Sequence, residues 1–321
     1  MMYSSDKVFI VVLYLMYVLI NKSIQFIVKY FFTKRLNLKE RYGENSWAII
    51  TGGSSGQGKV FAIELANEGF NIIIIGSERS YNTQKEIQKR YPDVKVIVIE
   101  RNFNDAYKKK FFKKIKEKIQ EISNGDISIM INNIGHRTAW EPYHEMPDKL
   151  INDTIACGTL VQAHMTKIAL GFFMKREDKS ILVNITVQCM HSNLFSFIEN
   201  YISLPYLSVY EGCNAFGFYH ANSIQKEYEN EKKIDMLNIT PGAVITENTQ
   251  FLDSTLFSVD AKIFVNNIID FMGNIQGTTC GYWGHEISNV LINVAPFMKY
   301  SILEKVGNTI CKNYMNNIYK K

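Results

Sequence analysis

Residues 47–69 read WAIITGGSSGQGKVFAIELANEG, and this stretch decides the fold. A short apolar run leads into a glycine-rich turn, and a helix-like segment, Lys59–Gly69, follows the turn. The glycines Gly52, Gly56 and Gly58 allow the backbone to turn tightly and to approach a pyrophosphate group. A helix that begins behind such a loop directs free N–H groups and the positive end of its dipole at an anion. A strand, a glycine turn and a helix in this order predict a nucleotide-binding βα unit.

The rest of the chain alternates short apolar runs with longer helix-like segments. We predict buried strands at WAIITG (47–52), FNIIIIG (70–76), VKVIVIE (94–100), ISIMINNIG (127–135), SILVNIT (180–186) and IDMLNITPG (234–242). Helices are predicted over Lys59–Gly69, Tyr81–Tyr91, Asp105–Ser123, Asp148–Arg176 and Asn214–Glu229. The near-continuous Ile and Val content is typical of strands that are buried on both faces. The alternation predicts an α/β fold with a doubly wound parallel, Rossmann-like sheet, in one domain over residues 47–321.

An apolar segment precedes this domain. Val8–Ile20 is unbroken, and Ile24–Phe32 continues it with Lys29 as its only charge. The whole stretch of about 25 residues is long enough for a helix that crosses a bilayer. We therefore predict a membrane anchor and a basic juxtamembrane segment over residues 1–46. The alternatives are a signal or transit segment, for which the small residues of a cleavage site are missing, and a buried helix.

Charges on either side of the apolar segment predict its orientation. Lys34, Arg35, Lys39 and Arg41 follow it, whereas Lys7 is the one basic residue ahead of it. The positive-inside rule then places the large domain on the cytosolic or matrix side of an integral membrane protein. The choice between the endoplasmic reticulum and the mitochondrial inner membrane stays open.

Composition narrows the class of protein further. The 321 residues are 46% hydrophobic and 21% charged, which excludes disordered and low-complexity classes. A net charge of +5 is too small at this length to indicate a nucleic-acid partner. The five cysteines form no C-x-x-C pair, and the six histidines have no metal-ligand spacing. Neither a disulfide framework nor a metal site is therefore predicted.

Two further motifs follow the glycine loop along the chain. N-N-x-G ends the fourth predicted strand, and P-G-x-x-x-T follows the sixth. With T-G-x-x-x-G-x-G these motifs resemble the short-chain dehydrogenase/reductase superfamily, over residues 47 to about 298. The resemblance implies a nicotinamide nucleotide, held by Thr51, Gly52, Ser54, Ser55, Gly56, Gly58, Arg79, Asn102, Asn132, Asn133, Gly135, Pro241, Gly242 and Thr246.

One subgroup of that superfamily is more closely similar. The similarity lies in the apolar N-terminus, in M-T-x-x-x-L at Met165–Leu170 with Arg176 beyond it, and in Gly281, Tyr282, His285 and Pro296. This subgroup contains membrane-bound 17β-hydroxysteroid dehydrogenases and very-long-chain 3-oxoacyl-CoA reductases. The resemblance implies NADPH-dependent reduction of a ketone on a lipid, at a site beside the bilayer.

The catalytic pattern of the family is only partly present. That pattern comprises a tyrosine acid/base, a lysine four residues later that lowers the pKa of the tyrosine, a serine that polarises the carbonyl group, and a helical asparagine. The resemblance places the tyrosine at Tyr210. Asn214 stands at the lysine position, Val187 at the serine position and Gly158 at the asparagine position. With Tyr210 as the one retained member, we expect that efficient catalysis has been lost.

Substitutes for the missing serine are few in the sequence. Thr186 precedes Val187 and is expected to point to the opposite face of the sheet. Roughly ten extra residues separate it from Tyr210 compared with the family pattern, and His191 or Ser192 within them would have to move into the site. Glu141, His144 and Glu145 lie after the fourth strand, where open α/β sheets bind substrates, or they are surface groups.

The cofactor positions depart less from the pattern. Gln57 replaces an aliphatic residue of the loop, and Asn102 stands at the acidic position that contacts adenine. Arg79 lies two residues beyond the position at which an arginine contacts a 2′-phosphate, whereas Glu78 suits the free ribose hydroxyl of NAD. We expect NADP(H) rather than NAD(H), with an empty nucleotide site as the remaining alternative.

These features lead to two main hypotheses. The first is a membrane-anchored reductase-like protein that has lost efficient catalysis and serves as an accessory or scaffold subunit beside other membrane proteins, with membrane lipid contacted by its N-terminal helix. The second is an active NADPH-dependent reductase of 3-oxoacyl-CoA or steroid-like ketones that uses Tyr210. A signalling or lipid-transfer role is a third. The lysine-rich face of residues 105–123 is either solvated or in contact with anionic lipid or an acidic partner.

Overall fold

A parallel sheet forms the centre of the computed structural model, which describes residues 2–135, 142–187, 206–247, 249 and 253–294. Its seven strands have the order β3-β2-β1-β4-β5-β6-β9. They are β1 (Trp47–Thr51), β2 (Asn71–Gly76), β3 (Val96–Glu100), β4 (Ile127–Asn132), β5 (Ser180–Ile185), β6 (Ile234–Ile239) and β9 (Gly277–Thr279). The order runs outward from β1 in both directions, so the predicted doubly wound sheet is confirmed. The short strand β9 was not predicted, because Gly-Thr-Thr has no apolar run.

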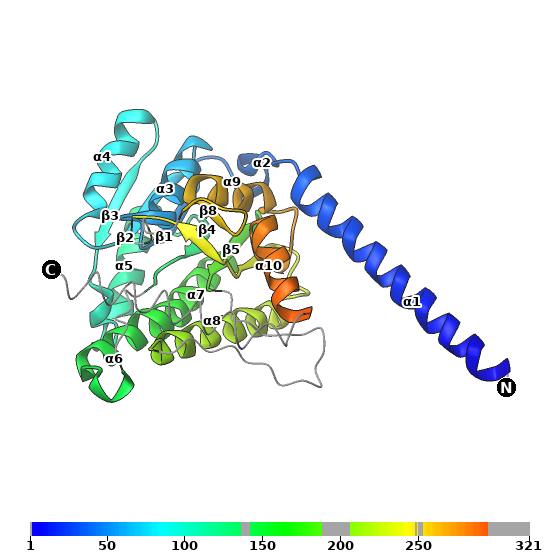
Figure 1. Ribbon diagram of the computed structural model, residues 1–321. Coiled ribbons are helices and arrows are strands. Elements are labelled where there is room, and N and C mark those ends of the chain that lie inside the picture. Colours follow the sequence, from blue (N-terminus) through cyan, green and yellow to red (C-terminus); the bar gives the residue numbers. More distant parts are fainter. Residues whose placement is uncertain (1, 136–141, 188–205, 248, 250–252, 295–321) are drawn as a thin grey trace.

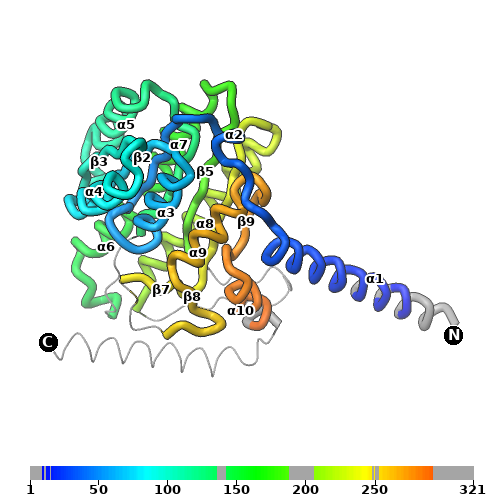
Figure 2. Tube along the Cα trace, turned by 90° about the horizontal axis from the view of Figure 1, so that it is seen from above, coloured from blue at the N-terminus to red at the C-terminus, as the bar shows by residue number. Residues whose placement is uncertain are grey.

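Helices cover both faces of the sheet (Figure 1, Figure 2). Alternate isoleucines of β2 show why: Ile72 and Ile74 belong to one core cluster, and Ile73 and Ile75 belong to the other. Successive side chains of a strand point to opposite faces, so a continuous apolar run requires cover on both. The first cluster is closed by α3 (Gly56–Asn67), α4 (Ser80–Arg90) and α9 (Ala261–Phe271), and the second by α5 (Phe111–Ser123), α7 (Val161–Phe173) and α8 (Ser208–Glu227).

The predicted helix limits need four corrections. Helix α3 begins at Gly56 and not at residue 59, because the end of the glycine loop is already its first turn. Helix α5 begins at Phe111 because Lys110, with a φ of 67°, breaks the segment after the 3₁₀ turn at Phe103–Asp105. Helix α8 begins at Ser208, six residues before the predicted start. The helix predicted over 148–176 is divided into α6 (Asp148–Ile155), a π-helical turn η4 (Ala156–Leu160) and α7.

The N-terminal helix α1 (Met2–Ile27) extends away from the domain in both views (Figure 1, Figure 2). A π-helical turn, η1 (Val28–Phe32), follows it, and Val12–Phe32 is the one stretch of the described residues that is long and apolar enough to cross a membrane. The short helix α2 (Leu38–Tyr42) comes next. Leu38 and Tyr42 are fully buried in the first core cluster, so the chain enters the domain core before β1.

Three further elements lie near the carboxyl end of the described chain. Strands β7 (Ala243–Ile245) and β8 (Ser258–Asp260) form a separate parallel pair after β6. Helix α10 (Trp283–Val294) follows β9 and lies beside the domain end of α1 (Figure 1, Figure 2). His285 of α10 is fully buried, with Nε2 3.0 Å from the carbonyl oxygen of Ala243, which joins α10 to the segment after Pro241 and Gly242.

Candidate nucleotide-binding and active site

The glycine loop lies between the carboxyl end of β1 and the N-terminus of α3. Gly52 and Gly56 have φ values of +73° and +55°, which L side chains rarely adopt. At Gly58 a Cβ atom would lie 2.3 Å from the Gly52 carbonyl oxygen, so helix and loop approach each other too closely for any side chain. The result is a backbone cradle that faces the free N–H groups of a twelve-residue helix, which is the geometry that holds phosphate.

Thr51 joins this cradle to the carboxyl end of the neighbouring strand β4. Its Oγ1 accepts hydrogen bonds from the backbone N–H groups of Asn133 (3.0 Å) and Ile134 (3.2 Å) and donates to the carbonyl oxygen of Ile131 (3.3 Å). Asn133 Nδ2 in turn donates to the carbonyl oxygen of Thr51 (3.2 Å). The predicted motifs T-G and N-N-x-G therefore lie together, because parallel strands bring their carboxyl ends to one edge of the sheet. Gly135 is exposed and has nothing within 4 Å of its Cβ position.

Thr246 lies on the opposite side of the glycine loop. A Cβ atom on Gly56 would be 3.5 Å from the Cβ and Cγ2 atoms of Thr246. The Thr246 N–H group donates to Thr249 Oγ1 (2.8 Å), which itself donates to the carbonyl oxygen of Val244 (2.7 Å). A turn stabilised in this way holds the end of the P-G-x-x-x-T segment over the cradle. The structure thus brings the three predicted motifs together.

Asn102 and Arg79 are the two residues predicted to contact the adenosine half of the nucleotide, and they lie before the 3₁₀ turn Phe103–Asp105 and at the start of α4. Asn102 Oδ1 accepts a hydrogen bond from the N–H group of Asn104 (3.1 Å), so the amide is oriented by its own loop. Arg79 stands at the start of α4 with an exposed side chain, and it forms no ion pair within the described part of the chain. Ser80 Oγ and Gln57 Oε1 are buried and have no hydrogen-bond partner among the described residues. The free N–H groups at the start of α3 are the feature that fits a bound nucleotide, because they suit its phosphate groups.

Tyr210 lies half-buried in the first turn of α8. One helical turn later, Asn214 Nδ2 donates to the backbone carbonyl oxygen of Tyr210 at 3.0 Å. The amide at the lysine position thus bonds back to its own helix, as short polar side chains in helices often do. It supplies no positive charge to the tyrosine hydroxyl.

Gly158 lies in η4, directly against α8. A Cβ atom there would be 2.7 Å from Cys213 Cβ and 3.2 Å from Cys213 Sγ. Cys213, Gly217 and Ala221 are the buried residues of α8 and recur every four residues, so a stripe of small side chains permits this close approach. The asparagine position of the family is therefore filled by a neighbouring thiol. Sequence reasoning did not detect this contact.

At the serine position, Val187 follows the end of β5 and is half-buried. Thr186 is buried, its Oγ1 donates to the backbone carbonyl oxygen of Ile239 (3.2 Å), and its Cγ2 lies 3.0 Å from the Cβ position of Gly217. Its side chain therefore faces α8 and not the far face of the sheet, which corrects the prediction. His191, Ser192 and Glu141 lie outside the described residues. His144 and Glu145 are exposed and 3.5 Å apart, on a surface turn.

A ladder of buried amides crosses the sheet beneath the site, and sequence reasoning missed it. Asn132 Nδ2 donates to Asn184 Oδ1 (2.9 Å), and Asn184 Nδ2 donates to Asn238 Oδ1 (3.0 Å). These three residues occupy register positions on the adjacent strands β4, β5 and β6. The signal was present in the sequence, since the predicted strands at 127–135, 180–186 and 234–242 each contain asparagine among apolar residues. Asn132 Oδ1 has no partner among the described residues, and the remaining bonds of the ladder fix the strand register beneath the candidate site.

A small pocket adjoins Tyr210. Its lining consists largely of apolar side chains from the segment before α6 to the start of α8, namely Met146, Leu150, Thr154, Tyr206, Leu207, Val209 and Tyr210. Tyr206 has a φ of 69°, which a non-glycine residue rarely adopts.

The fold and the cradle define a class, the doubly wound α/β proteins that bind nucleotides at the carboxyl edge of a parallel sheet. Residues 46–256 match the sequence profile of the short chain dehydrogenase family. This chain therefore belongs to the short-chain dehydrogenase family.

Relatives of known name support this assignment. Human 17-beta-hydroxysteroid dehydrogenase type 3 is 30% identical, over 78% of this chain and 75% of its own length. The very-long-chain 3-oxoacyl-CoA reductase of Mus musculus is 26% identical, over 86% and 83% of the two chains. Among solved structures, a short-chain dehydrogenase from Sphingobium yanoikuyae in complex with NADPH has a TM-score of 0.60 at 17% identity and covers 73% of this chain and 87% of its own. The predicted similarity to the steroid dehydrogenase and 3-oxoacyl-CoA reductase group is confirmed.

Proposed function

We propose that this protein is a membrane-anchored member of the short-chain dehydrogenase family that binds a nicotinamide nucleotide but has lost efficient hydride transfer. In this proposal it serves as an accessory subunit of a membrane assembly. The observation that carries the proposal is the packing around Tyr210, where Asn214 bonds back to its helix and Cys213 fills the space beside Gly158.

The chemistry of these positions supports the loss of rate. The lysine of the family pattern lowers the pKa of the catalytic tyrosine, and the amide of Asn214 carries no charge with which to do so. A neutral phenol still donates a proton in the reductive direction. Val187, however, offers no hydrogen bond to a substrate carbonyl, and the loss of one such donor typically lowers the rate by about 10²–10³.

The contact between Gly158 and Cys213 supports the loss of the family's asparagine at this position. An asparagine at position 158 would overlap Cys213 Cβ, so the family pattern cannot be restored there by one substitution. The two positions therefore form a matched pair in which the small residue and the thiol replace the catalytic group by packing. Burial raises the pKa of the Cys213 thiol to about 11, so this thiol is no substitute acid or nucleophile at neutral pH.

The cofactor site is retained more fully than the catalytic site. The cradle of Gly52, Gly56 and Gly58 with Thr246 above it suits the pyrophosphate, and Arg79 suits a 2′-phosphate better than a free hydroxyl. When bound, the nicotinamide ring of such a nucleotide supplies or accepts a hydride. We propose NADP(H) rather than NAD(H); the similar fold of a dehydrogenase solved with NADPH supports a nicotinamide nucleotide in general.

Membrane anchoring belongs to the same proposal. The stretch Val12–Phe32 is long and apolar enough to cross a bilayer, and none of it is buried within the protein. The basic residues that follow this stretch support a domain on the cytosolic or matrix side. Arg35 and Arg41 form ion pairs with acidic residues of the domain, so the charge bias next to the membrane rests mainly on Lys34 and Lys39.

Binding and turnover, measured on the same detergent-purified protein, test the proposal. We expect NADPH to bind, as shown by energy transfer to its fluorescence, without NADPH oxidation on 3-oxoacyl-CoA or ketosteroid substrates. A Val187→Ser/Asn214→Lys protein should bind NADPH equally and gain measurable oxidation. Turnover by the unaltered chain that Tyr210→Phe abolishes would overturn the loss of catalysis, and purification only as a lone monomer would overturn the accessory role.

An active lipid-ketone reductase is the second candidate. The names of the 17-beta-hydroxysteroid dehydrogenase and 3-oxoacyl-CoA reductase relatives favour it. In this candidate Tyr210 donates the proton and a group from the segment before α8 polarises the carbonyl. The Tyr210→Phe measurement separates the two candidates.

A further inference from the structure

The end of the anchor is firmly joined to α10. Lys29 Nζ lies 3.1 Å from Glu286 Oε2, and the Tyr30 hydroxyl donates to the same oxygen at 2.6 Å. The Phe31 and Trp283 rings lie beside each other, with centroids 6.3 Å apart. Ion pair, hydrogen bond and ring contact thus join one helical turn of the anchor to the first turn of α10.

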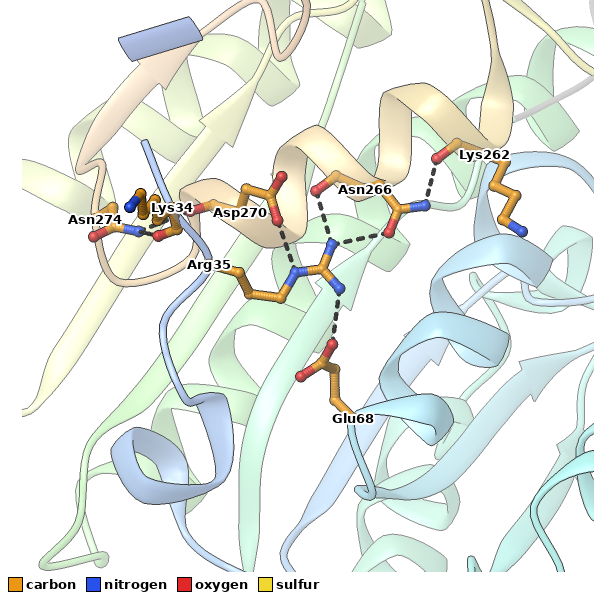
Figure 3. A network of polar contacts seen from close by, with 7 residues as sticks. All are labelled: Lys34, Arg35, Glu68, Lys262, Asn266, Asp270 and Asn274. Carbon is orange, nitrogen blue, oxygen red and sulfur yellow. Dashed lines mark hydrogen bonds and ion pairs between the residues drawn. The ribbon is translucent and has the colours of Figure 1, made fainter. Parts of the chain in front are cut away.

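Other contacts fix the direction of this junction relative to the domain. The Tyr30 hydroxyl also lies 3.1 Å from Thr279 Oγ1 at the end of β9, and its ring packs on Phe271 of α9 at 5.5 Å. Beyond η1, Arg35 binds Asp270 and Glu68 (Figure 3). The anchor therefore contacts α3, α9, β9 and α10, and its direction determines how the domain meets a membrane.

Helix α10 presents an apolar surface next to this junction. Trp283, Ile287, Val290 and Leu291 follow one another at helical spacing, and the side chains of Val290 and Leu291 are 52% and 55% exposed. The one carboxylate of α10, Glu286, is neutralised by Lys29. Both views show α10 leaving the junction on the same side of the domain as α1 (Figure 1, Figure 2).

The turn before β8 enlarges this surface. A Cβ atom on Gly284 would lie 2.0 Å from the carbonyl oxygen of Leu256, so α10 and the turn are in direct contact. The side chains of Leu256 and Phe257 are 48% and 41% exposed. We call Leu256, Phe257, Val290 and Leu291 together the α10 surface.

We propose that the α10 surface is a second membrane-contact site, buried in the interfacial region of the bilayer that α1 crosses. The inference rests on the anchoring proposed above. Three observations select lipid as the occupant: the surface continues from the anchor, the anchor is held against it at fixed direction, and it carries no unpaired charge. An apolar helix face of this kind lies about 5–10 Å below the headgroups. The pairing of α10 with the Ala243 segment then brings the carboxyl edge of the sheet close to the lipid.

The lysine-rich helix α5 is the competing membrane surface, and the structure argues against it. In both views α5 lies on the side of the domain away from α1 (Figure 1, Figure 2). A membrane crossed by α1 therefore meets α10 and not α5. Its lysine face is then solvated or directed to an acidic partner.

Spin labels on the full-length protein in phosphatidylcholine vesicles test the inference. Leu291→Cys, Ile20→Cys on the anchor and Lys114→Cys on α5 are each labelled with a nitroxide in a Cys189→Ser/Cys311→Ser background. Dissolved oxygen concentrates in lipid, whereas a nickel chelate stays in water. We expect position 291 to collide several-fold more with oxygen than with the chelate, as position 20 does, and position 114 to show the reverse.

The other outcomes are decisive as well. Water-like accessibility at position 291, equal to that at position 114, would overturn the inference. An immobilised label at position 291 that neither reagent reaches would show a protein contact, from a second copy or another segment, and would overturn it too. Position 20 reports the anchor separately, so a failure of anchoring is distinguished from a failure of the α10 surface.

Discussion

At the scale of single residues, Gly58 is where the nucleotide cradle tolerates least change. A Cβ atom there would lie 2.3 Å from the Gly52 carbonyl oxygen and 2.5 Å from Asn133 Nδ2. Neither neighbour moves away without disturbing the hydrogen bonds of Thr51. We therefore expect Gly58→Ala to lower the free energy of unfolding by about 1–3 kcal/mol and to abolish NADPH binding. Urea unfolding followed by circular dichroism and a fluorescence titration with NADPH measure the two effects.

Gly171 offers the matched control within the same domain. It is exposed in α7, with nothing within 4 Å of its Cβ position. Gly171→Ala should raise the free energy of unfolding by roughly 0.5–1 kcal/mol, because alanine loses less backbone entropy in a helix. Equal destabilisation by both substitutions, or normal NADPH binding by Gly58→Ala, would contradict the close packing of the cradle.

The buried cysteines permit a second prediction at this scale. Burial raises the pKa of Cys213 to about 11, and that of Cys157 and Cys280 to about 12. Because the thiolate is the reactive form, a Cys189→Ser/Cys311→Ser protein should not react with Ellman's reagent at pH 8 and should titrate three thiols in guanidinium. Fast reaction of the native protein would show that at least one of these thiols becomes exposed in solution.

Single residues also show what the sequence could predict. Thr246 was predicted from the resemblance to P-G-x-x-x-T, and it lies against Gly56 of the loop because parallel strands end at one edge of the sheet. The contact of Gly158 with Cys213 was beyond prediction, since it depends on the distance between two helices. Local patterns define which face of a helix is buried but not how closely it approaches a neighbour.

At the scale of elements, the strands were predicted better than the helix ends. A run such as Ile72–Ile75 specifies a buried strand almost alone, whereas a helix end depends on backbone geometry that only the folded chain defines. Lys110, in a left-handed conformation, delays the start of α5, and the π-helical turn at Ala156–Leu160 divides the long helix. Residues 34–41 were predicted as a juxtamembrane segment from their charge. The charge pattern does not disclose that Arg35 pairs with Asp270.

Arg35 joins three elements, and its substitution tests that junction (Figure 3). Its guanidinium group binds Asp270 (2.7 Å), Glu68 (2.8 Å) and Asn266 (2.9 Å), on α9 and at the C-terminal end of α3. We expect Arg35→Ala to lower the free energy of unfolding by about 1–2 kcal/mol, since several charge-assisted bonds are lost at a partly exposed site. Urea unfolding in detergent measures the change.

Lys34→Ala is the control for Arg35→Ala. The Lys34 side chain is exposed, and its contact to Asn274 uses the backbone carbonyl oxygen, which the substitution retains. Its effect should stay within about 0.5 kcal/mol of zero. Equal effects of the two substitutions would mean that the net positive charge of this segment, and not the hydrogen bonds and ion pairs of Arg35, holds the segment to the domain.

At the scale of the whole molecule, anchor and domain form one unit. The apolar run predicted the helix α1, but Lys29 and Glu286 are 257 residues apart in the chain, and no local pattern predicts that they pair. Their pairing fixes the end of the N-terminal helix relative to the domain. In the membrane-anchored protein proposed above, the orientation of the candidate nucleotide site relative to the membrane is consequently a property of the fold and not of a flexible linker.

The pairing of Glu286 should make this unit sensitive to acid. Burial alone would raise the pKa of Glu286, but the charge of Lys29 and the hydrogen bonds from Tyr30 and Lys29 outweigh burial and hold that pKa below its ordinary value of 4.5. A depressed carboxyl pKa contributes stability that is complete above the unfolded value and is lost as the pH falls through the folded value.

Glu286→Gln should therefore lower the free energy of unfolding by roughly 2 kcal/mol at pH 7, and by progressively less below pH 4.5. Thermal unfolding of both proteins between pH 7 and pH 3.5 measures the difference, with the exposed Glu117→Gln as a control that should show none. A difference that stays constant across this range would mean that Glu286 acts by shape and not by charge, and that the anchor is not held by its carboxylate.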